Sequence, residues 1–184
     1  SMLDCQIAIL ENAIARYLSK NEIPKPMGSR HPSIAPFEAF KTKDSHIIIA
    51  AGNDKLFENL CNFLKIPEIS KDTKFITNSQ RSENMDELKI ILENKLKEKT
   101  TSEWVKGMEE LKIPCGPIFN IKEAVENPQI RERNMIVKSF HKVVGEFRTA
   151  GNPIKMSSYD DSTTRGDIPD LDQHRDKIIK EFCN

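Results

Sequence analysis

The chain has 184 residues with 28 basic and 28 acidic side chains, so its formal net charge is zero. Hydrophobic residues make up 38% and charged residues 30%, which is typical of a folded globular protein and excludes a disordered or coiled-coil chain. With no basic excess, and with Ile47–Ala51 as its longest apolar run, the sequence indicates no nucleic-acid partner, no membrane span and a cytoplasmic location.

The first expected element is an amphipathic helix over residues 2–19, whose apolar residues recur at steps of three and four positions. The stretch 24–36 holds four prolines and a glycine, so it cannot be helical and is predicted to be a loop. Two short β-type runs, 37–41 and 46–51, then predict a hairpin. The apolar face of the first helix needs a partner, which the sequence does not identify.

Helices are expected to dominate the middle of the chain. Asn53 is well placed to cap a helix that carries an apolar stripe as far as residue 64. A longer helix is expected over residues 81–99, with its lysines and glutamates facing outward. Thr100–Glu103 has the pattern of a capping box that opens a further helix, and Pro114 ends that helix.

The last third of the chain is predicted to be less regular. Residues 113–118 contain too many prolines and glycines for regular structure. The remaining expected elements are a short helix, a second β-hairpin, a polar linker and a last amphipathic helix. They lie at residues 120–127, 136–150, 157–170 and 172–183.

No general catalytic or nucleotide-binding motif is present in the sequence. The four cysteines are more than fifty residues apart, so no CxxC pair begins a zinc site, and we interpret them as inert thiols. His46, His141 and His174 each stand alone and are interpreted as sheet-surface or helix-start residues. We therefore expect no metal site and no permanently bound cofactor.

The loop Gly28–Ser33 is the segment whose residue types most suggest binding. Gly28 allows the backbone to approach a ligand closely, and Arg30 can pair with a phosphate or a carboxylate. His31 and two serine hydroxyls lie within the same six residues. An exposed linker without function has a similar composition, and the residues alone leave both interpretations open.

Several segments resemble the class III CoA-transferases, a family that includes formyl-CoA transferase, carnitine CoA-transferase and the α-methylacyl-CoA racemases. The similar segments are Ser1–Asp4, Met27–Phe40, Ala51–Asp54, Ile113–Ile118, Glu123–Ala124, Asn127–Ile130 and Ile168–His174. They follow the family order and spacing, cover nearly the whole chain, and resemble the C-terminal half of such a protein. The sequence departs from the family at residues 29–31, which replace a run of glycines, and at Asp172, where glycine is usual.

The resemblance implies an α+β fold. It is the fold of the small inserted α/β domain of a class III CoA-transferase, flanked by an N-terminal and a C-terminal helix that belong to a large Rossmann-like domain. The implied parts are a large-domain helix, a linker with an active-site loop, the small α+β domain, and a linker with a helix that returns to the large domain. These parts are residues 1–20, 21–36, 37–150 and 151–184. The family also implies a homodimer.

The implied reaction moves CoA from an acyl-CoA to a carboxylic acid through an aspartyl-CoA thioester. The family's nucleophilic aspartate lies upstream of the matching segments, so no catalytic residue is assigned here, and Asp4 is interpreted as a helix-head residue. The implied substrate loop consists of Gly28, Ser29, Arg30, His31 and Pro32. We therefore expect a fragment that is inactive alone, with a coenzyme A thioester as substrate of the intact enzyme. A racemase-type parent and a non-enzymatic binding module are the alternatives.

Overall fold

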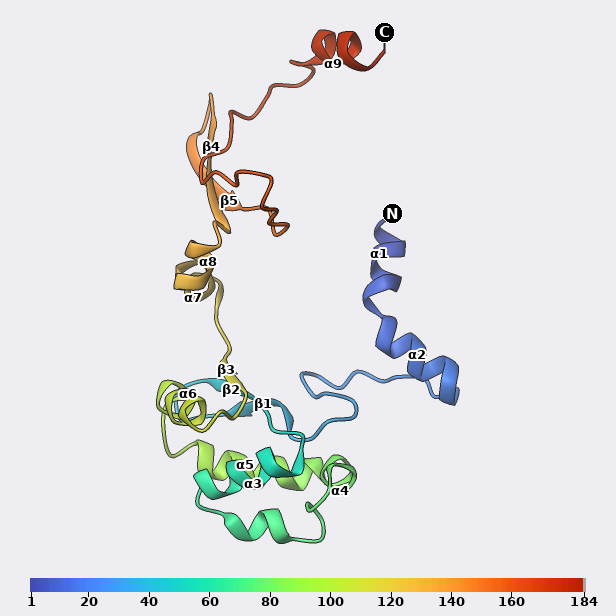
Figure 1. Ribbon diagram of the computed structural model, residues 1–184, viewed down its shortest axis with the longest axis vertical. Coiled ribbons are helices and arrows are strands. Elements are labelled where there is room, and N and C mark those ends of the chain that lie inside the picture. The colour runs from blue at the N-terminus through green and yellow to red at the C-terminus, as the bar shows by residue number, and fades with distance from the viewer. Residues whose placement is uncertain (184) are drawn as a thin grey trace. The chain divides into compact units, whose positions relative to one another are not determined.

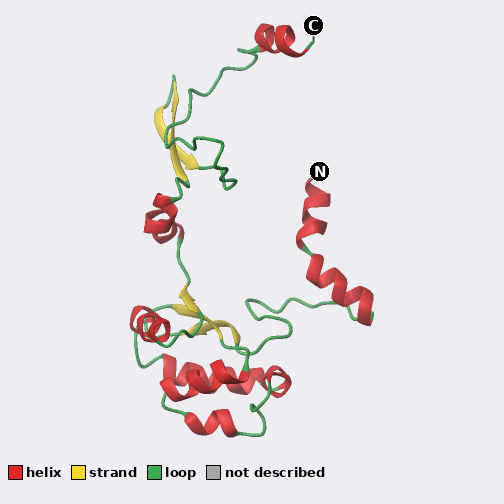
Figure 2. Ribbon diagram, viewed as in Figure 1, coloured by secondary structure: helices red, strands yellow, loops and turns green. Residues whose placement is uncertain are grey.

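The computed structural model describes residues 1–183. Its contacts divide the chain into two compact units, one over Ser1–Ile118 and one that begins at Phe119. Each unit combines helices with its own small antiparallel sheet (Figures 1 and 2). The predicted mixed α and β composition is therefore confirmed. None of the helices described is long and apolar enough to serve as a membrane span.

The predicted first helix is present as two consecutive helices, α1 (Met2–Ile9) and α2 (Glu11–Lys20). The Ser1 hydroxyl accepts a hydrogen bond from the Asp4 amide at 3.2 Å, which caps the start of α1. Asn21 ends α2 in the left-handed conformation, with φ of 55°. No side chain of either helix is buried, so their apolar face stays uncovered among the described residues.

The sheet of the first unit has the order β1-β2-β3, with antiparallel neighbours. The predicted hairpin is confirmed as β1 (Phe37–Lys41) and β2 (His46–Ala50). The expectation that residues 113–118 are irregular is wrong, because Cys115–Pro117 forms β3. A proline is compatible with this strand because β3 lies at the sheet edge, where a missing amide proton costs no internal bond.

Five helical segments follow the hairpin, and two of their predicted starts are confirmed. The segments are α3 (Asp54–Phe63), η1 (Pro67–Lys71), α4 (Asn78–Glu83), α5 (Met85–Leu96) and α6 (Thr101–Glu110). Asn53 caps α3 through the Leu56 amide at 2.8 Å, and Thr100 with Glu103 forms the expected capping box of α6. The single helix predicted over 81–99 is wrong, because Asn84 leaves helical geometry and separates α4 from α5.

The hydrophobic core of the first unit lies between its sheet and its helices, where α5 contacts β1 and α6 contacts β2 and β3. Its fully buried side chains include Phe40, Ile47, Ile49, Phe57, Leu60, Leu88, Leu92, Leu96 and Met108. Burying each such side chain contributes about 1.5–3 kcal/mol. Trp104 joins this core, and its Nε1 donates to the Leu96 carbonyl at 2.6 Å, so no buried donor is lost.

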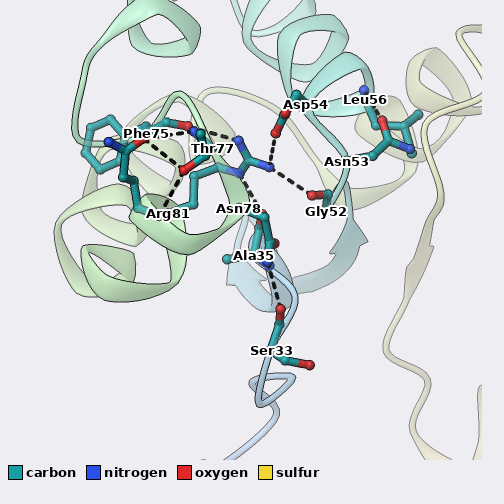
Figure 3. A network of polar contacts seen from close by, with 11 residues as sticks. Ser33, Ala35, Gly52, Asn53, Asp54, Leu56, Phe75, Thr77, Asn78 and Arg81 are labelled. Carbon is teal, nitrogen blue, oxygen red and sulfur yellow. Dashed lines mark hydrogen bonds and ion pairs between the residues drawn. The ribbon is translucent and has the colours of Figure 1, made fainter.

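Arg81 lies at the centre of a polar network inside this unit and is 0% exposed (Figure 3). Its guanidinium donates to the carbonyls of Ala35, Phe75 and Gly52 at 2.8, 2.9 and 2.8 Å. It also pairs with the Asp54 carboxylate at 2.8 Å. One α4 side chain therefore connects the segment before β1, the end of β2 and the start of α3.

The second unit begins with α7 (Ile121–Glu126) and α8 (Pro128–Glu132), followed by the hairpin of β4 (Ile136–His141) and β5 (Gly145–Ala150). This hairpin was predicted. Residues 157–170 were expected to form a polar linker, and the structure shows that part of this segment is bonded to β4. The Lys138 amide donates to the Thr163 carbonyl at 2.9 Å. This part of the segment therefore follows the outer edge of β4. The last helix, predicted over residues 172–183, is α9 (Arg175–Phe182); His174 lies at its N-cap, the helix-start position expected for it, and the helix has no buried side chain.

Candidate functional site

The loop predicted to bind substrate lies along the outer edge of β1. The His31 amide donates to the Phe37 carbonyl at 2.9 Å, and the Ser29 hydroxyl accepts from the Ala39 amide at 3.1 Å. These β1 groups point away from β2, which pairs with the strand's other edge. The loop is therefore held against the sheet rather than extending freely into solvent.

Side chains of α5 cover the rest of the same edge. Lys89 Nζ donates to the Ala39 carbonyl at 2.8 Å, and Glu93 Oε1 accepts from the Lys41 amide at 3.0 Å. An uncovered edge strand offers unpaired backbone groups to other chains, so this arrangement removes a site of aggregation. It also fixes the position of α5 relative to the loop.

Both ends of the loop have a defined geometry. Gly28 adopts a φ of +65°, a conformation that glycine reaches at little cost, and the Arg30 amide closes a turn onto the Met27 carbonyl at 3.3 Å. At the other end, Asn78 donates to the Ser33 carbonyl at 2.8 Å and accepts from the Ala35 amide at 2.9 Å (Figure 3). The backbone between these anchors is thereby constrained.

His31 is oriented by contacts on its ring. It stacks on Phe37 with ring centroids 5.2 Å apart and an interplanar angle of 6°. Its Nδ1 accepts from the Ser33 amide at 3.2 Å. An accepting Nδ1 carries no proton, so the neutral imidazole holds its proton on Nε2 and presents a donor there. The half-buried Pro32 follows directly in the chain.

Arg30 is bound by two carboxylates that differ greatly in burial. Its Nε donates to Glu38 Oε1 at 3.0 Å, and its Nη2 donates to Asp86 Oδ1 at 2.7 Å. The Glu38 side chain is 5% exposed, whereas that of Asp86 is 92% exposed. Lys89 pairs with the second oxygen of Glu38.

The charge of Arg30 is secured by these neighbours. Burial favours the neutral form, but the hydrogen bond to Asp86 and the charge of Glu38 outweigh burial and raise the pKa of Arg30 above its usual value. The guanidinium is therefore fully protonated at any physiological pH.

The structure brings the predicted loop residues together and adds three that the sequence interpretation missed, Glu38, Asp86 and Lys89. Glu38 could have been found from the alternation in β1, since residues two apart share a face and Phe40 faces the core. A carboxylate at an inward-facing position requires a cationic partner. Asp86 and Lys89 gave no such signal, because lysine and acidic residues are common on exposed helix faces.

Cys61 and Cys115 offer no nucleophile at neutral pH. Burial raises the pKa of Cys61 to about 12, and burial also raises the pKa of Cys115. Both sulfurs therefore stay protonated, and the thiolate is the reactive form of cysteine. Within residues 1–183, no three His, Cys, Asp or Glu side chains lie together in a way that could hold a metal ion.

Comparison with known proteins identifies close relatives along the whole chain. The family model described as CoA-transferase family III matches residues 1–175. The chain is 36% identical over 183 residues to an acetyl-CoA:oxalate CoA-transferase of Acetobacter aceti, covering 100% of this chain and 46% of that protein. It is 35% identical over 181 residues to a succinyl-CoA:glutarate CoA-transferase of Homo sapiens, covering 98% of this chain and 41% of that protein.

A solved structure agrees with these relatives. The crystal structure of a CAIB/BAIF family protein from Brucella suis superimposes with a TM-score of 0.74 at 32% identity, covering 98% of this chain and 46% of that protein. The chain thus spans less than half the length of the curated relatives it matches.

Proposed function

Because this chain belongs to CoA-transferase family III, we propose that it forms part of an enzyme that moves CoA from an acyl-CoA to a carboxylic acid. The family match over residues 1–175 carries this proposal, and it confirms the resemblance found in the sequence. Two relatives above 30% identity, named for transfer to oxalate and to glutarate, support the same reaction class.

We propose that the reaction proceeds through an aspartyl-CoA thioester. An aspartate attacks the thioester carbonyl to form a mixed anhydride and release CoA thiolate, which then attacks the aspartyl carbonyl and frees the donor acid. The acceptor carboxylate then attacks the aspartyl-CoA thioester, which gives a second mixed anhydride and releases CoA thiolate. The thiolate attacks the acceptor's carbonyl in this anhydride, so that the aspartate is freed and a new acyl-CoA is formed. A carboxylate suits this role because its anhydride exchanges readily. We place this aspartate outside the present chain, which is therefore inactive alone.

The proposed contribution of this chain to the active site is the loop of Gly28, Ser29, Arg30, His31 and Pro32. The anchored backbone of the loop supports this role, since donors held in place before the reaction cost little reorganisation. The His31 Nε2 proton and the charged Arg30 guanidinium are the donors it offers. The loop residues stay a prediction until an intact enzyme is tested.

The uncovered helices suggest how the chain is divided. We propose that residues 1–20 and the C-terminal helix pack on a large Rossmann-like domain, that 21–36 and 151–184 contain the linkers, and that 37–150 is the small domain. Exposed apolar side chains support this, since Leu3, Leu18 and Phe182 are 71%, 75% and 74% exposed. We also propose that the whole protein forms a homodimer.

We further propose that the acid substrate is a short dicarboxylic acid. The acids in the names of the two relatives, oxalate and glutarate, both carry two carboxylates. The loop of this chain carries an arginine, whose planar guanidinium is suited to binding a carboxylate. A substrate with two carboxylates has one to react and one to be recognised.

The decisive test compares the whole protein that contains this chain with residues 1–184 alone. Each is given succinyl-CoA or acetyl-CoA with glutarate or oxalate, and formation of the new thioester is followed by chromatography. We expect transfer by the whole protein and none by the chain alone. Epimerisation of a 2-methylacyl-CoA without transfer would favour the racemase, and neither reaction together with tight protein binding would favour an interaction module.

A further inference from the structure

The Arg30 guanidinium has hydrogen-bonding capacity that its two carboxylate partners leave unused. Arginine carries five N–H donors. The Nε donor and one donor of Nη2 are engaged by Glu38 and Asp86. Neither donor of Nη1, nor the second donor of Nη2, has an acceptor among residues 1–183. Once Asp86 is displaced, Nη1 and Nη2 can together donate to both oxygens of another carboxylate.

The two carboxylates that hold Arg30 are not equally exchangeable. Glu38 is nearly buried, and both of its oxygens are engaged, one by Arg30 and the other by Lys89. Removing a buried partner leaves an uncompensated charge, so this contact is permanent. Asp86 is 92% exposed and makes one bond to Nη2. Exposed ion pairs contribute little to stability, so the carboxylate of a solute can compete with Asp86 for Arg30.

The loop backbone fixes where this exchange can occur. Ser29 and His31, on either side of Arg30, are both bonded to β1. Arg30 therefore projects from a constrained position, and Glu38 sets the direction of its guanidinium through Nε. Glu38 acts as a positioning residue, since it acts on a ligand only through Arg30.

We propose that Arg30 recognises the second carboxylate of a dicarboxylic acid substrate, and that Asp86 occupies this place until the acid displaces it. The inference rests on the proposed function, since it names a residue of this loop as the determinant of acid specificity. The exchange is balanced in charge, because one carboxylate replaces another beside the Arg30 guanidinium. Asp86 then turns into solvent, where its charge is fully hydrated.

The test measures acceptor specificity in the whole protein carrying Arg30→Met. Succinyl-CoA is the common donor, and the acceptors are glutarate and valerate, which has a methyl group where glutarate has its second carboxylate. We expect the KM for glutarate to rise at least about tenfold, the loss typical of a charged hydrogen bond. The KM for valerate should change little. Arg133→Met, which removes an exposed arginine of the second unit, is the matched control.

A second variant has the opposite expected sign. Asp86→Asn removes the competing charge, so the KM for glutarate should fall by about two- to fivefold, as the strength of an exposed ion pair implies. This result does not depend on valerate being a measurable substrate. Circular dichroism melting of all variants verifies that they are folded.

The outcomes separate the two proposals. If the unmodified protein shows no CoA transfer at all, the proposed function fails and this inference fails with it. If transfer is present but Arg30→Met raises the KM of both acids equally, or Asp86→Asn leaves the KM for glutarate unchanged or higher, then Arg30 does not read the second carboxylate and the function stands.

Discussion

The central helices of the first unit and the helices near the two ends of the chain carry the same kind of apolar stripe but differ completely in burial. Leu60 of α3 and Leu92 of α5 are both 0% exposed, whereas Leu18 of α2 is 75% and Phe182 of α9 is 74% exposed. An amphipathic pattern thus specifies a face that must be covered, and it does not specify which polypeptide covers it.

The largest change in the free energy of unfolding is expected when the buried guanidinium of Arg81 in α4 is removed. Arg81→Met leaves the carbonyls of Ala35, Phe75 and Gly52 without their donor, and it should lower the free energy of unfolding by about 3–5 kcal/mol. Arg16→Met on α2 should change it by less than about 0.5 kcal/mol. Urea unfolding followed by circular dichroism measures both, and equal losses would contradict the comparison.

Substituting one leucine in a buried stripe and one in an exposed stripe tests this comparison directly. Leu60→Ala opens a cavity in the packed core and should cost about 2–5 kcal/mol of unfolding free energy. In this chain alone, Leu18→Ala should cost under about 0.5 kcal/mol, because its side chain is already in water. In the whole protein, the proposed contact with a large domain should make Leu18→Ala costly as well. A neutral result there would contradict the proposed domain division.

The smallest expected effect concerns the start of α6 and depends on pH. The Thr101 amide donates to the Asp44 carboxylate at 2.8 Å, and this bond, with those from the Thr101 and Thr42 hydroxyls, lowers the pKa of Asp44 below its usual value. Because the folded pKa is depressed, the stabilisation is present above the unfolded pKa and is lost as pH falls through the folded pKa. Asp44→Asn should therefore flatten the acid side of the stability curve.

The matched control for this measurement is Asp4→Asn at the head of α1. Stability is followed by thermal melting at a series of pH values in the acid range. Asp4 is exposed and lies in a helix without buried side chains. Substituting Asp4 should leave the dependence of stability on pH unchanged. If both variants flatten this dependence equally, the acid response is not specific to the α6 cap.

Sequence interpretation succeeded where the determining contacts are local. The capping box of Thr100 and Glu103 joins residues three positions apart, and the hairpin of 37–50 is defined by alternation over a few residues. It failed at Cys115–Pro117, where pairing with β2 imposes strand geometry on a segment rich in helix and strand breakers. It also failed at Asn84, where one residue separates two helices within a continuous apolar pattern.

The candidate site shows the same division. The sequence by itself determined the loop, its glycine and its arginine, together with the family resemblance. Only the tertiary structure decided that Arg30 meets Asp86, 56 positions away, and that Arg81 meets Ala35, 46 positions away. Contacts within one helical turn follow from the geometry of the local backbone. Contacts between distant residues depend on how whole elements pack, so no single segment of sequence contains them.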